Sequence, residues 1–191
     1  MKIEIEIKRL GGIRNLFPEK NTFLTSNLIC DLESLFDCKL PDDFKFILQK
    51  YGICTFNNTI AFNAISGKAE YEHQVESNII SNVFKTSTIA VFLGANSRSY
   101  NIFDYISIYK NRIPNLCLPI ATDGMGNLIL LSLEKTKFGK IYFWDHENEW
   151  DEDDFEEDMG FSMPPEAKFQ NIWLIGNTFN DFIERCYIYN L

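Results

Sequence analysis

Residues 116–146 read LCLPIATDGMGNLILLSLEKTKFGKIYFWDH, and they hold the clearest structural signal in the chain. Three short apolar runs, Leu116–Ala121, Leu128–Leu133 and Lys140–Trp144, are separated by segments that contain Gly, Asp or Asn. Runs of this length and composition between turn residues are typical of consecutive strands. Because connections this short join antiparallel neighbours, we predict a β-meander around residues 116–146.

The middle run is apolar at every position of Leu128–Leu131 and not at alternate positions. Both faces of this strand are therefore expected to be covered, which places it near the centre of a sheet. The preceding segment, Asp123–Asn127, contains two glycines but lacks the spacing of a phosphate-binding loop and leads into a strand. We interpret it as a hairpin turn that the side chains of Asp123 and Asn127 close.

The flanking sequence predicts helices and further strands. Ile3, Ile5 and Ile7 alternate with charged residues, so Lys2–Lys8 is expected to be a strand with one wet face, followed by a loop over Arg14–Asn21. Helical spacing predicts helices over Asn27–Phe36, over the segment from Pro41 to Tyr51, over Tyr100–Lys110 and after Thr178, and more weakly over Glu70–Phe84. Further strands are expected in Cys54–Ile65, at Thr88–Leu93 and, as the last one, at Ile172–Ile175. This order indicates an α+β fold with a mostly antiparallel sheet.

Length and composition bound the kind of protein. A chain of 191 residues with 46% apolar residues is expected to form one domain, 1–191, with a sizeable core. The chain has no apolar window long enough to span a membrane, and its N-terminus does not resemble a signal peptide. Five cysteines without a C-x-x-C spacing are interpreted as buried free thiols. We therefore expect a cytoplasmic protein.

The net charge of −9 has one source, the segment 147–158. It contains nine acidic residues and no Lys or Arg, and the other 18 acidic residues equal the 18 Lys and Arg of the chain. We interpret it as a solvent-exposed acidic loop. A nucleic acid is a poor ligand for such a surface, because phosphate binding needs a basic footprint.

Several segments together resemble the SMI1/KNR4 family, also called the SUKH superfamily. They are LPDDFKFILQKYG (Leu40–Gly52), the PIA-x-D-x-x-GN run that begins at Pro119, GKIYFWDH (Gly139–His146) and NTFNDFIERC (Asn177–Cys186). The resemblance covers residues 27–187 and implies a central antiparallel sheet flanked by helices. It also implies a bacterial immunity protein that binds and neutralises a toxin, or a regulatory scaffold as in fungal relatives.

The acidic segment is the expected partner-binding surface. Its carboxylates suit a basic toxin such as a nuclease. They mimic the phosphates of the nuclease's own substrate and pair with the cationic groups that bind those phosphates. The candidate residues are Trp150, Asp151, Asp153, Asp154, Phe155, Glu156 and Glu157. Trp144 is either a further aromatic anchor or part of the core. We expect a monomer or a weak homodimer.

Enzymatic activity has little support in the sequence. The chain has two histidines and no G-x-S-x-G motif, and no catalytic residue, cofactor or metal site is predicted. The acidic segment does not match a calcium-binding loop, because Glu156 stands where such a loop needs Gly. The remaining enzymatic alternative is a metal-assisted hydrolase that uses Asp145, His146 and the acids after them. Adjacent strand residues point to opposite faces, which disfavours that site.

Overall fold

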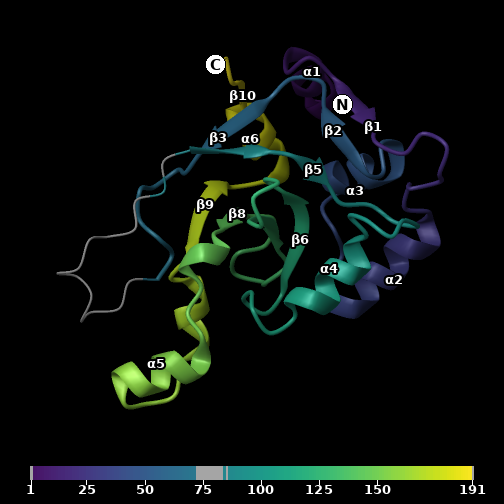
Figure 1. The fold of residues 1–191 in the computed structure, drawn as a ribbon. Helices are drawn as coiled ribbons and strands as arrows, with labels where there is room; N and C mark the ends of the chain where they lie inside the picture. Colours follow the sequence, from purple (N-terminus) through teal and green to yellow (C-terminus); the bar gives the residue numbers. More distant parts are fainter. Residues whose placement is uncertain (1, 72–83, 85, 191) are drawn as a thin grey trace.

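The computed structural model describes residues 2–71, 84 and 86–190. Within them, a seven-stranded antiparallel sheet has the order β1-β2-β5-β6-β7-β8-β9, and a three-stranded antiparallel sheet has the order β10-β3-β4 (Figure 1). The larger sheet comprises β1 (Ile13–Asn15), β2 (Cys54–Phe56), β5 (Val91–Phe92), β6 (Cys117–Thr122), β7 (Leu128–Ser132), β8 (Ile141–Trp144) and β9 (Ile172–Gly176). The smaller one comprises β10 (Tyr187–Ile188), β3 (Ile60–Asn63) and β4 (Thr86–Ile89). The α+β prediction is confirmed.

The predicted meander lies in the middle of the larger sheet. On β7, Leu130 pairs with Pro119 of β6 on one side and with Tyr142 of β8 on the other. Both faces of β7 are covered, as its continuous apolar run predicts. Ile129 and Leu131 face the main core, whereas Leu128 and Leu130 face a second apolar cluster, which also contains Cys117, Tyr142, Trp144 and Ile172. Trp144 is therefore a core residue.

The N-terminal strand prediction is wrong, because Lys2–Arg9 forms helix α1. Ile3 and Ile7 lie four residues apart and are buried, whereas Ile5 is 68% exposed. Alternating isoleucines fit a strand, but two of them also fit one face of a helix. Contacts with α6 (Phe179–Arg185) favour the helix, since the Arg9 guanidinium donates to the carbonyls of Ile183, Glu184 and Cys186.

The chain changes sheets at two places where we expected simpler structure. The turn after β2 passes Asn57 and Asn58, whose side-chain amides donate to the carbonyls of Gly11 and Leu10 at the end of α1. The expected single strand Thr88–Leu93 is divided at Ala90 into β4 and β5, which belong to different sheets. The expected loop from Arg14 begins inside β1, because that edge pairs with β2.

Helices α2 (Ser26–Phe36), α3 (Asp42–Lys50) and α4 (Ile102–Tyr109) confirm three of the helix predictions. Thr25 caps α2, and Phe44, Ile47 and Leu48 form the buried side of α3. The predicted helix Glu70–Phe84 falls largely on residues outside those that the structure describes. Thr178 caps α6 by accepting the N–H of Asp181, but β10 follows this helix, so β9 is not the last strand.

The interpretation of the cysteines needs one correction. All five are free, and Cys54, Cys117 and Cys186 are buried, but Cys30 is exposed and Cys38 is partly exposed. Burial raises the pKa of Cys54 and Cys186, and raises the pKa of Cys117 to about 12. The buried thiols therefore remain protonated and behave as small core side chains.

Candidate partner-binding surface

The turn between β6 and β7 has the predicted side-chain closure. The Asp123 carboxylate accepts the N–H groups of Met125 and Asn127 and the side-chain amide of Asn127. Asn127 in turn holds His146, because its Oδ1 accepts the His146 N–H and lies 2.7 Å from His146 Nδ1. A Cβ atom at Gly126 would lie 2.8 Å from His146 Cε1, so glycine allows the turn to pack against the imidazole.

The second half of the acidic segment, from Glu152, is a helix and not the loop that we expected. Helix α5 (Glu152–Met159) begins after Asp151, whose carboxylate accepts the N–H groups of Asp153 and Asp154, and ends at Gly160 with φ 74°. Three acids in its first turn complement the positive end of the helix dipole. In Figure 1 the helix projects from the body of the protein as an arm. We call residues 150–163 the acidic arm.

Aromatic packing inside the acidic arm involves Phe155, one of the predicted partner-binding residues. Phe155 is buried, with its ring centroid 5.3 Å from that of Trp150 and 5.5 Å from that of Phe161. Phe155 therefore stabilises the arm and offers little surface to a partner. Trp150 is half-buried and lines a groove, and Phe161, which the sequence did not single out, is 48% exposed.

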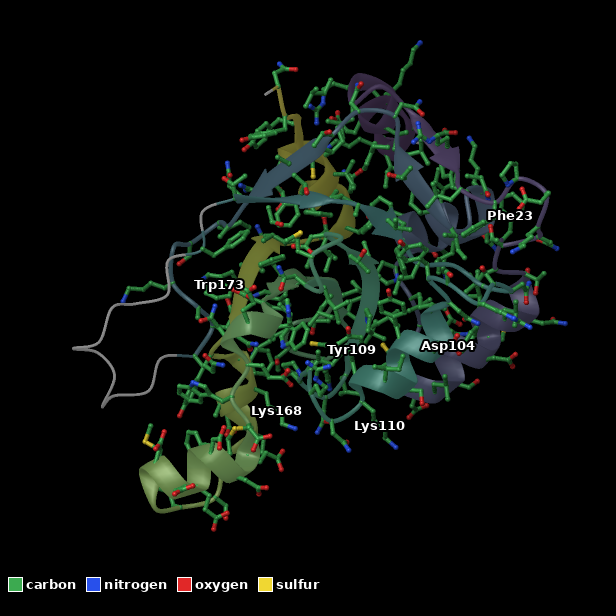
Figure 2. All side chains as sticks on the ribbon, viewed as in Figure 1. Phe23, Asp104, Tyr109, Lys110, Lys168 and Trp173 are labelled. Atoms are coloured by element: carbon green, nitrogen blue, oxygen red, sulfur yellow. The ribbon has the colours of Figure 1, made fainter. Side chains whose placement is uncertain are left out.

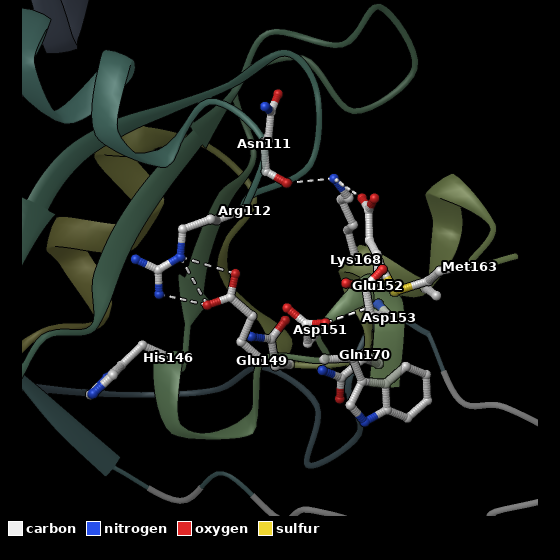
Figure 3. Close-up of a pocket in the computed structure, with 13 residues that line it drawn as sticks. Asn111, Arg112, His146, Glu149, Asp151, Glu152, Asp153, Met163, Lys168 and Gln170 are labelled. Carbon is white, nitrogen blue, oxygen red and sulfur yellow. Dashed lines mark hydrogen bonds and ion pairs between the residues drawn. The ribbon is translucent and has the colours of Figure 1, made fainter. Parts of the chain in front are cut away.

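A groove of about 500 Å³ lies between the acidic arm and the sheet (Figure 3). At one end, Arg112 Nε and Nη2 bind the Glu149 carboxylate at 3.0 and 2.6 Å from its Oε2. At the other end, Lys168 forms an ion pair with Glu152 at 3.1 Å and donates to the Asn111 carbonyl. The predicted residues Trp150, Asp151 and Asp153 line this groove, together with His146 and Gln170. Arg112, Lys168 and Gln170 were missed, because they come from distant segments.

The charge on α5 is not explained by helix stability. Like charges lie four residues apart three times, in the pairs Glu152 and Glu156, Asp153 and Glu157, and Asp154 and Asp158. Each such pair costs roughly 0.2–0.5 kcal/mol on an exposed helix. The last turn has no basic residue to complement the negative end of the dipole. A surface that lowers stability in this way is expected to serve another purpose.

The described residues offer little for catalysis. No group of three or more His, Cys, Asp and Glu side chains among them is arranged to hold a metal ion. Asp145 and His146 have separate local tasks, since Asp145 accepts the Glu147 N–H while His146 contacts Asn127. Among the helices of the described residues, none is long and apolar enough to cross a membrane.

These features define an α+β protein whose distinctive surface is an acidic arm beside a polar groove. A sequence profile of the family described as SMI1-KNR4 cell-wall matches residues 26–160, and the chain belongs to this family, a part of the SUKH superfamily. The chain is 26% identical, over 182 residues, to the SPbeta prophage-derived uncharacterized protein YokK of Bacillus subtilis (strain 168). This alignment covers 95% of the chain and 83% of the relative. No solved structure matches the chain at a significant level.

Proposed function

We propose that the protein is a bacterial immunity protein that acts in the cytoplasm, where it binds a cognate toxin and neutralises it by forming a complex. Family membership supports this proposal, since the SUKH superfamily includes immunity proteins. One relative is described as prophage-derived, an origin on a mobile element that fits a toxin–immunity pair. The partner is a basic protein, such as a nuclease, and the chain acts as a monomer or weak homodimer.

The observation that carries the proposal is the exposed charge of residues 147–158, most of which belong to the acidic arm. Of the nine acids in residues 147–158, Glu149 and Glu152 are held in ion pairs and Asp151 caps the helix. The others are exposed: Glu147, Asp153, Asp154, Glu156, Glu157 and Asp158. Their shared field attracts a cationic partner from a distance and mainly raises the association rate.

The groove supplies the short-range part of the interface. Its aromatic wall is Trp150, and its polar groups include Gln170 and the paired side chains of Arg112 and Glu149. Aromatic and arginine side chains in partly enclosed sites contribute most to binding energy at protein interfaces. The acidic arm therefore guides the toxin, and the groove beside it holds the toxin in place.

Co-expression tests the proposal directly. The chain is produced together with the toxin encoded by the neighbouring gene, and growth and co-purification are scored. The proposal predicts that growth is restored and that the two proteins elute as one complex. Restored growth without a complex would contradict neutralisation by binding. A stable complex with a host protein, without any protection from the toxin, would instead indicate the regulatory scaffold.

A further inference from the structure

A second, smaller cavity lies between α4 and the turn that joins β6 to β7. It has a volume of about 210 Å³, and its lining includes Tyr100, Tyr105, Tyr109, Thr122, Gly124 and Gly126. Figure 2 labels Asp104 and Tyr109, which lie on α4, and Lys110, which directly follows the helix. Pockets for drug-sized ligands are larger, about 300–1,000 Å³. The cavity therefore suits a single large side chain. We call it the tyrosine pocket.

The wall of the tyrosine pocket contains a buried polar atom that lacks a partner. Thr122 is 6% exposed, and its hydroxyl oxygen has no hydrogen-bond partner among the described residues. Leaving such a group unpaired lowers stability. Of the four buried side-chain atoms without a partner among the described residues, Thr122 Oγ1 alone belongs to a residue that lines this pocket. The oxygen is covered in this structure, so a ligand donor must displace part of its cover to reach it, and the hydrogen bond would then remove this penalty.

The tyrosines form an organised cluster. The rings of Tyr105 and Tyr109 stack with centroids 5.8 Å apart and planes 26° from parallel. Tyr100 adopts φ 60°, a conformation that costs energy for a residue other than glycine, and its carbonyl accepts the Gly94 N–H. Burial, with further contributions from Tyr109 and Tyr100, raises the pKa of Tyr105, so its hydroxyl stays protonated.

We propose that the tyrosine pocket binds an arginine side chain of the toxin, an inference that rests on the proposed function. A guanidinium is planar, stacks on aromatic rings and has five N–H donors for hydroxyl acceptors. Among the described residues, no Lys or Arg lines the pocket. The acidic segment 147–158, the source of the net charge of −9, borders the neighbouring groove. The same aromatic cluster already stacks one guanidinium, because Arg112 Cζ lies 5.0 Å from the Tyr109 ring centroid.

The tyrosine pocket adjoins the groove beside the acidic arm. Tyr109 lines the pocket and contacts Arg112, which lines the groove. On the other side, Gly126 lines the pocket and packs against His146, which also lines the groove. One basic partner can therefore cover the arm, the groove and the pocket together. The arm accelerates its approach, whereas the pocket slows its departure.

The experiment uses NMR titration of the ¹⁵N-labelled full chain. The probe is N-acetyl-arginine methylamide, and its matched control is N-acetyl-citrulline methylamide, which has the same shape without the charge. We expect the arginine probe to shift the amide signals of Gly124 and Gly126 in a saturable way and to bind about fivefold or more tightly than citrulline. Absence of these shifts, or equal affinity for both probes, would overturn the proposal.

Two variants separate binding from folding. Thr122→Val removes the unpaired hydroxyl, so the free protein should melt a few degrees higher while the arginine probe binds about fivefold more weakly. Tyr105→Phe keeps the ring and loses only the hydroxyl, so it tests the hydroxyl as an acceptor apart from ring stacking. Ile108→Ala, at an exposed residue of the same helix, is the control variant. Unchanged affinity in Thr122→Val would overturn the proposal. A lower melting temperature would show that the hydroxyl is needed for folding, and would overturn it too.

The outcome is independent of the toxin experiment. If the arginine probe binds as expected and co-expression gives no protection, the immunity function fails while the pocket stands. If protection and complex formation are observed but the probe does not bind, the pocket assignment fails and the proposed function stands.

Discussion

Arg112 joins the end of α4 to the acidic arm by binding Glu149 through two nitrogens, while its guanidinium lies 5.4 Å from the ring centroid of Trp144. Glu149 immediately precedes Trp150, the first residue of the arm. A bidentate pair that also rests on a buried aromatic ring is more strongly oriented than a simple surface ion pair. Arg112 therefore fixes the direction in which the arm leaves the body.

Replacing Arg112 tests this role. Arg112→Met keeps much of the aliphatic contact with Trp144 and removes all hydrogen bonds from this side chain to Glu149. We expect the amides of residues 150–163 to exchange hydrogen at least threefold faster, with a change in unfolding free energy of about 1 kcal/mol or less. Hydrogen exchange measured by mass spectrometry checks this. Exchange that stays unchanged in the arm would show that other contacts orient it.

The charge on α5 is expected to oppose stability and favour binding. Glu157→Lys converts the repulsion with Asp153 into an attractive pair and places a cation in the last turn of the helix. It should raise the free energy of unfolding by roughly 0.5 kcal/mol and weaken toxin binding. Urea denaturation and the complex dissociation constant measure the two effects. Glu19→Lys, an exposed acid outside the arm, is the control. A stability loss in Glu157→Lys would contradict this interpretation.

The N-terminal helix gives a direct test of the fold. Ile3 is buried and Ile5 is exposed, whereas a strand would place both on one face. Ile3→Ala should lower the free energy of unfolding by about 2–4 kcal/mol, and Ile5→Ala by less than about 0.5 kcal/mol. Chemical denaturation of both variants measures this. Similar losses in the two variants would support the strand instead.

The buried carboxyl of Glu33 is expected to make the folding stability of the protein depend on pH. Burial pushes the pKa of this carboxyl up, but the Lys39 ammonium at 2.6 Å and the Leu40 N–H at 3.0 Å outweigh it, so the net pKa lies below 4.5. A carboxyl whose pKa falls on folding stabilises the protein above pH 4.5, and this contribution is lost as the pH falls through the folded pKa. Glu33→Gln should therefore cost about 1.5 kcal/mol at pH 7 and progressively less below pH 4.5. A cost that is independent of pH between 3 and 7 would contradict this.

The meander could be predicted because its signal is local. Continuous apolar runs and the Asp123–Asn127 turn fix three strands without help from distant residues. The N-terminal helix could not be predicted, because its seven alternating residues fit both the strand and the helix periodicity. Contacts with α6 decide between the two. For α5, the capping residues Asp151 and Gly160 were a usable signal, but the density of like charges pointed to a loop.

The binding surface was predictable only in part. The acidic residues and Trp150 could be found from composition, because they are contiguous in the sequence. The opposite wall of the groove, with Arg112 and Lys168, is assembled from segments more than 50 residues apart. The tyrosine pocket combines two separate stretches, residues 100–109 and 122–128, and its unpaired hydroxyl on Thr122 is visible only in the folded chain.

The most direct test of the central claim is the rate constant for association with the neighbouring toxin, measured by stopped-flow fluorescence from about 20 to 500 mM NaCl. The variant combines Asp153→Asn, Asp154→Asn and Glu157→Gln, three exposed acids of the arm, and the matched control neutralises the exposed acids Glu19, Asp31 and Asp37. If the acidic arm steers association, the variant should associate at least about tenfold more slowly than the unmodified protein at low salt, and its rate constant should depend less on salt. The control should associate at a near-normal rate. Equal rates and equal salt dependence in the variant and the control would contradict steering by the arm.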